Sequence, residues 1–286
     1  MSLRPLALLV WLASFVALPA PAGNLPARRL QGEIAGARWA ALVPDNWNNR
    51  LLLLAPDRRN APDPLAATLD ETAPDNEALL DAGWALATSS YRRTGPILVD
   101  AIEDLRSLRE QLAEELGAPA MTVVAGRGMG GLITVLLAER HADEFHAFLA
   151  HDPRFAERDP RALRLRCDGQ PRGPMLLLFG IDTARDAIAY HDRARDTANA
   201  ESVVPALWFH SSDTEDAKTA PAPLPEAVSA LVDWVRSGQP PADRLEHLPA
   251  AEDPPPAAPE TPPAPAPRRE APPLPEEPPP SVPVES

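Results

Sequence analysis

The stretch from Val123 to Arg140, VVAGRGMGGLITVLLAER, contains glycines whose spacing could support chemistry. Gly126, Gly128 and Gly131 satisfy the pattern G-x-G-x-x-G, in which a turn between a strand and a helix offers backbone N–H groups to phosphates. Asp152, which follows a later strand, then stands about where an acid would bind a ribose. One interpretation is therefore an oxidoreductase that binds a dinucleotide.

Three features weaken the dinucleotide interpretation. Such a fingerprint normally lies in the first strand-to-helix turn of its domain, whereas several predicted strands and helices precede Gly126. The segment between the glycines and Asp152 is somewhat long for the compact binding unit. The chain also carries a predicted export signal, and free nicotinamide cofactor is scarce outside the cytoplasm. We expect no cofactor.

The elements around this turn alternate between short apolar strands and helical patterns. Strands are predicted at 32–44 (two strands around a turn at Ala35-Gly36), 50–56, 84–90, 121–126, 145–151, 174–180 and 203–210, and helices at 76–83, 99–117, 132–140, 183–194 and 224–238. This alternation indicates an α/β fold with a mainly parallel sheet and helices on both faces. In helix 99–117 we expect Asp100 to be the N-cap and Gly117 to end the helix.

From about Trp39 to Pro241 the sequence resembles the α/β-hydrolase superfamily, in particular its exported esterase-like and peptidase-like members. The stretch VVAGRGMGGLITVLLAERHADEF looks like the strand, turn and helix that carry the nucleophile of that family. WALATSSYRR resembles the strand and Tyr-Arg just upstream, and SALVDWVRSGQPP resembles the terminal helix.

The resemblance also exposes a departure at the nucleophile. The family turn reads G-x-S-x-G, whereas this chain has Gly126-Arg127-Gly128-Met129-Gly130, so Gly128 stands at the serine position. The mechanism needs a hydroxyl oxygen that attacks a carbonyl, and glycine has none. Glycine does suit the positive φ that this turn requires.

Other family positions also lack the residues that catalysis needs. Where the family commonly has His-Gly for its oxyanion donor, this chain has Pro56-Asp57, which offers a proline without an N–H and a carboxylate. The segment SSDTEDAKTAPAPLPEAV, where the catalytic histidine is expected, contains no histidine.

Two residues could be catalytic remnants. Asp182 and His210 follow predicted strands close to the positions of the family acid and base, and such a pair could activate water directly. The simpler interpretations are a helix N-cap for Asp182 and a strand-end loop residue for His210.

Further polar residues follow strands at the edge where ligands bind in open α/β sheets. His151 and Asp152 belong to this group, but the sequence does not distinguish them from turn residues. Ser89 and Ser90 carry the hydroxyls nearest to this edge of the sheet, but they end a strand that does not carry the nucleophile in the family. The residues that we expect around a pocket are Pro56, Asp57, Tyr91, Arg127, Gly128 and Met129.

The ends of the chain differ in composition from its middle. Residues 1–22 combine one arginine, an apolar stretch and Ala20-Pro21-Ala22, so we predict a cleaved signal peptide and a periplasmic or secreted protein without a transmembrane span. From Pro249 to Ser286 the chain has 16 of its 37 prolines, and we predict a disordered, acidic tail there. The domain is predicted at 23–248.

Charge and cysteine content exclude some functions. The net charge of −14 argues against nucleic acid as a partner. Cys167 is the single cysteine, so no intrachain disulfide can form, and we expect no structural zinc site built on cysteines.

The leading hypothesis is an exported α/β-hydrolase-like protein that is catalytically inactive as a serine hydrolase. It would act as a binding or scaffolding module for a small apolar or ester-like ligand or for a protein partner. The alternatives are a hydrolase of altered mechanism that uses Asp182 and His210, and the dinucleotide-binding oxidoreductase.

Overall fold

The structure is a computed structural model that describes residues 27–210, 224–245 and 248. The predicted signal peptide (1–22) and proline-rich tail (249–286) lie outside the described residues, so both stay predictions.

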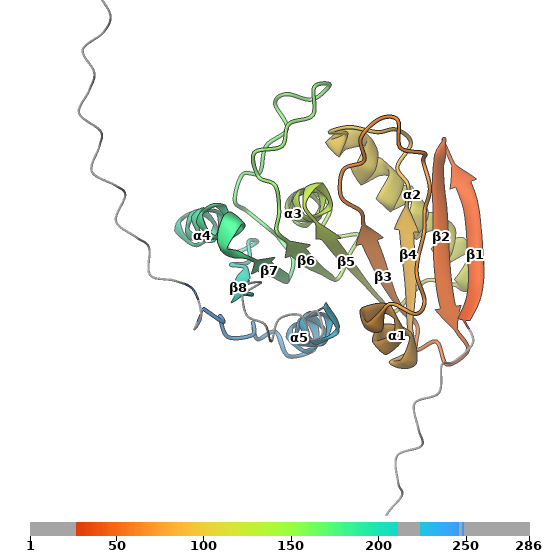
Figure 1. The fold of residues 1–286 in the computed structure, drawn as a ribbon. Helices are drawn as coiled ribbons and strands as arrows, with labels where there is room; N and C mark the ends of the chain where they lie inside the picture. Colours follow the sequence, from red (N-terminus) through yellow and green to blue (C-terminus); the bar gives the residue numbers. More distant parts are fainter. Residues whose placement is uncertain (1–26, 211–223, 246–247, 249–286) are drawn as a thin grey trace, which may run out of the picture. The chain divides into compact units, whose positions relative to one another are not determined.

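Eight strands form one sheet in the order β1-β2-β4-β3-β5-β6-β7-β8 (Figure 1). Their bounds are β1 Ala27–Ile34, β2 Ala37–Pro44, β3 Arg50–Ala55, β4 Trp84–Ser89, β5 Met121–Arg127, β6 Ala147–His151, β7 Met175–Phe179 and β8 Ala206–Phe209. β2 is antiparallel to its neighbours β1 and β4, and all the other neighbouring strands are parallel. The predicted fold class, an α/β fold with a mainly parallel sheet, is confirmed.

In the part of the chain that the structure describes, five helices cover the two faces of the sheet. They are α1 Pro74–Asp81, α2 Leu98–Leu116, α3 Met129–Arg140, α4 Ile181–Asp196 and α5 Leu224–Ser237. α2, α3 and α4 lie on one face, and α1 and α5 lie on the other (Figure 1). Leu51 and Leu53 of β3 pack in the hydrophobic core on the side of α2, α3 and α4, and Leu52 packs in the core on the side of α1 and α5. Because both faces of β3 are buried, its sequence is a continuous apolar run.

The start of α2 differs from the prediction. The helix begins at Leu98, and its N-cap position is Ile97, so the expected N-cap role of Asp100 is wrong. Asp100 instead lies in the first turn, where its carboxylate pairs with Arg93 and is favoured by the positive end of the helix. The predicted end is confirmed, because Gly117 follows the last helical residue with φ 90°.

The glycines after Gly128 allow α3 to pack very closely against the sheet. A Cβ on Gly130 would lie 2.0 Å from the carbonyl oxygen of Ala55 in β3. A Cβ on Gly131 would lie 2.7 Å from the carbonyl oxygen of His151 in β6. Both distances are far inside van der Waals contact, so the packing of the helix itself requires glycine at these positions.

Among the helices that the structure describes, none has the length and apolar character needed to span a membrane.

Candidate functional site

The turn between β5 and α3 centres on Gly128. Its φ of 62° and ψ of −118° lie where side chains are strongly disfavoured, so the sequence places glycine where the backbone favours it. The backbone N–H of Gly128 donates to the carbonyl oxygen of His151, with 3.0 Å between the two atoms. The turn is therefore tied to the end of β6.

The carboxylate of Asp57, which follows β3, lies directly beside this turn. Its Oδ1 accepts hydrogen bonds from the backbone N–H of Met129 at 2.8 Å and from that of Arg58 at 2.6 Å. Its Oδ2 accepts a hydrogen bond from Arg154 at 2.8 Å. A Cβ built on Gly128 would lie 2.5 Å from both carboxylate oxygens. Asp57 thus fills the space in which a side chain at position 128 would begin.

These contacts bear on the dinucleotide interpretation. A phosphate would need free N–H groups at the start of α3, but Gly128 and Met129 already donate to His151 and Asp57. A carboxylate at the same place would also repel a phosphate. Close backbone packing accounts for Gly126 and Gly131, and positive φ accounts for Gly128, so the glycine pattern is explained without a cofactor and this interpretation is not favoured.

A second cluster forms where β6 and β8 end on either side of β7. His151 is the last residue of β6, Asp152 follows it, and His210 follows β8. The two Nε2 atoms of His151 and His210 are 3.0 Å apart. The Oδ2 of Asp152 lies 3.3 Å from the Nε2 of His151 and 3.6 Å from that of His210. Three polar atoms therefore converge on one point.

Asp152 is held firmly within this cluster. Its Oδ1 accepts hydrogen bonds from the backbone N–H of Gly180 at 2.9 Å and from the hydroxyl of Thr183 at 2.7 Å. Burial alone would raise the pKa of Asp152, but the two nearby histidines and these bonds outweigh it and hold the pKa well below its usual range. Its backbone has φ 44°, an uncommon conformation that aspartate tolerates better than most residues.

The structure does not pair Asp182 with His210, as the sequence-based hypothesis of an altered hydrolase would require. Asp182 is an exposed residue in the first turn of α4, whose N-cap position is Gly180. The acid beside His210 is Asp152 instead.

The two serines at the end of β4 have structural contacts. Ser90 donates to the carbonyl of Tyr91 at 2.8 Å and accepts from the N–H of Arg38 at 3.0 Å. Ser89 accepts from the N–H of Tyr91 at 3.0 Å. Both side chains are buried, and these bonds stabilise the chain as it leaves the strand.

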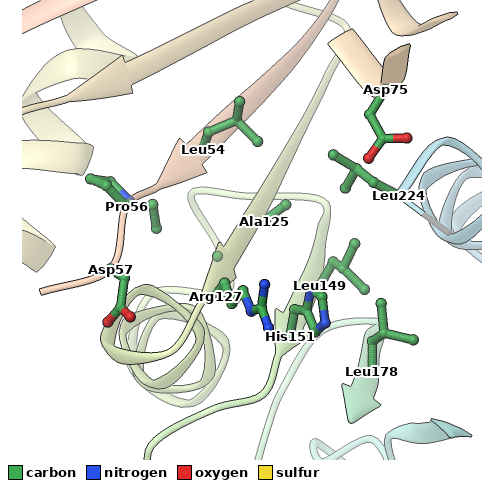
Figure 2. Close-up of a pocket in the computed structure, with 12 residues that line it drawn as sticks. Leu54, Pro56, Asp57, Asp75, Ala125, Arg127, Leu149, His151, Leu178 and Leu224 are labelled. Carbon is green, nitrogen blue, oxygen red and sulfur yellow. The ribbon is translucent and has the colours of Figure 1, made fainter. Parts of the chain in front are cut away.

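A cavity of about 340 Å³ opens at the carboxyl ends of the central strands, on the side of α1 and α5. Leucine side chains from β3, β6, β7 and α5 surround it, with Asp75 at its edge and Arg127 beside His151 (Figure 2). The lining residues are Leu54, Ala55, Pro56, Asp57, Asp75, Ala125, Gly126, Arg127, Leu149, His151, Leu178 and Leu224.

The predicted pocket residues divide into two groups. Pro56, Asp57 and Arg127 line the cavity, whereas Gly128, Tyr91 and Met129 are not among its lining residues. Tyr91 and Met129 are buried, and the hydroxyl of Tyr91 donates to the carbonyl oxygen of Pro56 at 3.1 Å. Tyr91 therefore does not line the cavity but stabilises Pro56, which does.

Asp75, from α1, is an acid that the sequence reading did not select. Its carboxylate points toward the cavity (Figure 2). Burial raises the pKa of Asp75 above its ordinary value, and the nearby His151 offsets part of that effect. A partly buried carboxylate with a raised pKa is a better proton donor or hydrogen-bond donor at mildly acidic pH than an exposed one.

Cys167 lies away from this cavity, in a separate depression beside Tyr190 and Arg193. Burial raises the pKa of its thiol well above the ordinary value, and the nearby Glu139 and Asp168 act in the same direction. The thiol is therefore protonated near neutral pH and poorly nucleophilic.

The sheet order, the crossover helices and the placement of the turn after β5 are those of the α/β-hydrolase fold, which the structural comparisons bear out. Searches against family models and against curated protein sequences find no match. The solved structures that resemble the chain include an esterase from the archaeon Pyrobaculum calidifontis, at 15% identity and a TM-score of 0.54, covering 76% of this chain and 88% of that one. An arylesterase matches at 13% identity and a TM-score of 0.53, over 76% and 88% of the two chains.

Peptidases also share the fold. A prolyl endopeptidase structure matches at 13% identity with a TM-score of 0.53, over 74% of this chain. The chain spans only 39% of that protein and 36% of a second, aminopeptidase-like neighbour. At these identities the comparisons establish the fold, and the activities of these neighbours remain theirs.

Sequence reasoning did not single out the His151–Asp152–His210 cluster. The signal was present, because one histidine ends a parallel strand and is followed by an aspartate, and a second histidine directly follows another parallel strand. It could be used only with the sheet order, which places β6 and β8 on either side of the same strand.

Proposed function

We propose that this protein does not act as a serine hydrolase and instead binds a small, largely apolar ligand in the cavity of the α/β-hydrolase fold. The observation that carries the proposal is the carboxylate of Asp57 beside Gly128, bonded to the N–H of Met129. We take Gly128 as the counterpart of the family's serine, on the resemblance of the turn and on its positive φ.

The same carboxylate opposes acyl transfer in two ways. In the fold family, the N–H after the nucleophile helps stabilise the oxyanion, and here the corresponding N–H of Met129 is already bonded. A negative charge beside a developing oxyanion would raise the barrier further. A hydrolase that activates water with Asp182 and His210 is not favoured, because Asp182 is exposed and a different acid contacts His210.

The cavity supports binding of a small molecule. Its volume falls within the range of about 300 to 1,000 Å³ that is usual for ligand sites. Its wall is mainly apolar, while Arg127 and His151 offer polar contacts to one end of a ligand. An ester or a short acyl chain with one polar group fits this distribution. We further propose, from the N-terminal sequence, that the protein acts after export.

A binding experiment with two matched variants tests this proposal. The full chain is titrated with methyl hexanoate and with p-nitrophenyl butyrate, and binding is followed by saturation-transfer NMR. Leu54→Trp should fill part of the cavity and abolish binding, whereas Leu163→Trp, the same change at a leucine that is 62% exposed, should leave it intact. Equal binding by the two variants, or release of nitrophenolate above the buffer rate, would contradict the proposal.

A further inference from the structure

We propose that His151, Asp152 and His210 bind a divalent transition-metal ion, with Zn²⁺ as the best fit. The three facing atoms, two Nε2 and one Oδ2, are 3.0, 3.3 and 3.6 Å apart. Zinc bonds to nitrogen and oxygen of about 2.0–2.2 Å in a tetrahedron place neighbouring ligand atoms about 3.3–3.6 Å apart. The two distances to Asp152 fall in this range, and the two Nε2 atoms need to separate by only about 0.3 Å to form one face of a zinc tetrahedron.

The electrostatics of the cluster also favour a cation. A neutral imidazole whose Nε2 lacks a proton is an acceptor, as is a carboxylate oxygen. When such atoms approach one another to near 3 Å, their lone pairs repel unless a proton or a metal ion lies between them. One proton can join the two histidines or one histidine and Asp152, whereas a single metal ion satisfies all three at once.

The surroundings hold the ligand atoms in place. The second carboxylate oxygen of Asp152 is fixed by Gly180 and Thr183, which is the outer-shell support that ligating carboxylates usually have. His151 is the last residue of β6 and His210 directly follows β8, so both are positioned by strands of the sheet. Their side chains are 25% exposed and that of Asp152 is 17% exposed, so an ion could reach the cluster from solvent.

One neighbouring charge opposes a metal ion. The guanidinium of Arg127 lies 3.4 Å from the Oδ2 of Asp152. Its side chain is 68% exposed, so this pair is well screened and weak, and a doubly charged ion at bonding distance would outcompete it. Removing this arginine should strengthen metal binding slightly.

The choice of ion follows from the ligand types. Two imidazoles and one carboxylate suit Zn²⁺, Co²⁺, Ni²⁺ or Cu²⁺ and suit Ca²⁺ or Mg²⁺ poorly. Three protein ligands would leave a fourth position for solvent or for a polar group of a ligand, and His151 also lines the cavity. The metal site does not rest on the proposed ligand binding.

Metal titration of the full chain, prepared without a polyhistidine tag and stripped with a chelator, tests this site. We expect one equivalent of Zn²⁺ by calorimetry, and one equivalent of Co²⁺ with the intense visible absorption of four-coordinate cobalt. Loss of a contact that only supports a metal ligand typically weakens metal binding by about 10- to 100-fold. His210→Ala and His151→Ala remove a ligand itself, so each should weaken Zn²⁺ binding by more than this. Thr183→Ala, which removes such a contact, should weaken it by about 10-fold.

His141→Ala is the matched control for these variants. His141 is 26% exposed and contacts an acid, Glu144, at 3.2 Å, but it is not part of the cluster. His141→Ala should bind Zn²⁺ and Co²⁺ with the stoichiometry and affinity of the wild-type chain and should show the same visible spectrum with Co²⁺. The proposal is overturned if the wild-type chain binds neither ion stoichiometrically, or if His210→Ala and His151→Ala bind as well as His141→Ala does.

Discussion

Asp57 and Met129 are joined by a hydrogen bond of 2.8 Å between the carboxylate Oδ1 and the backbone N–H at the start of α3. This bond places a negative charge at the positive end of the helix, which is a stabilising arrangement. It also places the carboxylate next to Gly128, in the position that a side chain there would need. The same carboxylate thus stabilises the turn and crowds position 128.

The first prediction concerns the coupling between these two positions. Positive φ costs a residue with a side chain about 1–3 kcal/mol, so Gly128→Ala should lower the free energy of unfolding by at least this amount. The new methyl group would also displace the Asp57 carboxylate from its hydrogen bonds. In an Asp57→Ala background this second part should disappear, so the double variant should be more stable than the sum of the single effects predicts.

Urea unfolding of the four proteins in this double-mutant cycle measures the coupling. We expect a coupling free energy of at least about 0.5–1 kcal/mol, which is typical of residues in contact. Strict additivity would show that the carboxylate does not confine position 128.

The second prediction is that a hydroxyl at position 128 is not sufficient for catalysis. Gly128→Ser should leave the hydrolysis of p-nitrophenyl butyrate at the background rate. Even where the new side chain displaces the Asp57 carboxylate from the N–H of Met129, its negative charge stays beside the turn and opposes an oxyanion, and Pro56 has no N–H to donate. Steady-state assays on the folded variant check this. A turnover rate clearly above that of the wild-type chain would mean that the surrounding groups are competent for acyl transfer.

The third prediction links Glu139 to the pH dependence of stability. Burial raises the pKa of this carboxyl, although hydrogen bonds from Tyr190, Gly169 and Asp168 offset part of the effect. Because the folded state favours the protonated form, the contribution of Glu139 to the free energy of unfolding is fully present below the ordinary pKa of 4.5 and is lost as the pH rises through the higher folded value.

Glu139→Gln should remove this component. Free energies of unfolding measured from about pH 4 to pH 7 should decrease less steeply for the variant than for the wild-type chain. Parallel curves with only a constant offset would show that Glu139 does not titrate in this range.

The fourth prediction is that Cys167 is unreactive in the folded protein. Its raised thiol pKa leaves little thiolate near neutral pH, so the disulfide reagent DTNB should react slowly with the native chain and rapidly in denaturant. Equal rates in the two states would contradict a half-buried, protonated thiol.

Much of the fold could be predicted from the sequence because its signals are local. Runs such as that of β3 identify strands buried on both faces, and Gly117 marks the end of α2 through its positive φ. The sequence predicts a later start for α2 than the structure has, because aspartate is a good N-cap residue by type. The actual partner of Asp100 is Arg93, and this contact depends on the loop before the helix.

The site was less predictable because it depends on long-range contacts. The sequence identified Gly128 and Asp57 as unsuitable for acyl transfer, but it did not reveal that the two meet in space. It offered Asp182 as a possible partner of His210, because Asp182 stands close to the position of the acid in the family that the sequence resembles. The structure instead brings Asp152 to His210 across β7, and Asp152 is anchored there by Gly180 and Thr183.

The most direct test of the account is the reaction of the full chain with a fluorophosphonate, which modifies activated serine nucleophiles. Intact-mass spectrometry, with a known serine esterase as a positive control, reads out the result. We predict no adduct on this protein, because Gly128 offers no hydroxyl and the hydroxyls of Ser89 and Ser90 are buried against the backbone. A stoichiometric adduct on any serine, lost when the protein is unfolded first, would contradict the central claim.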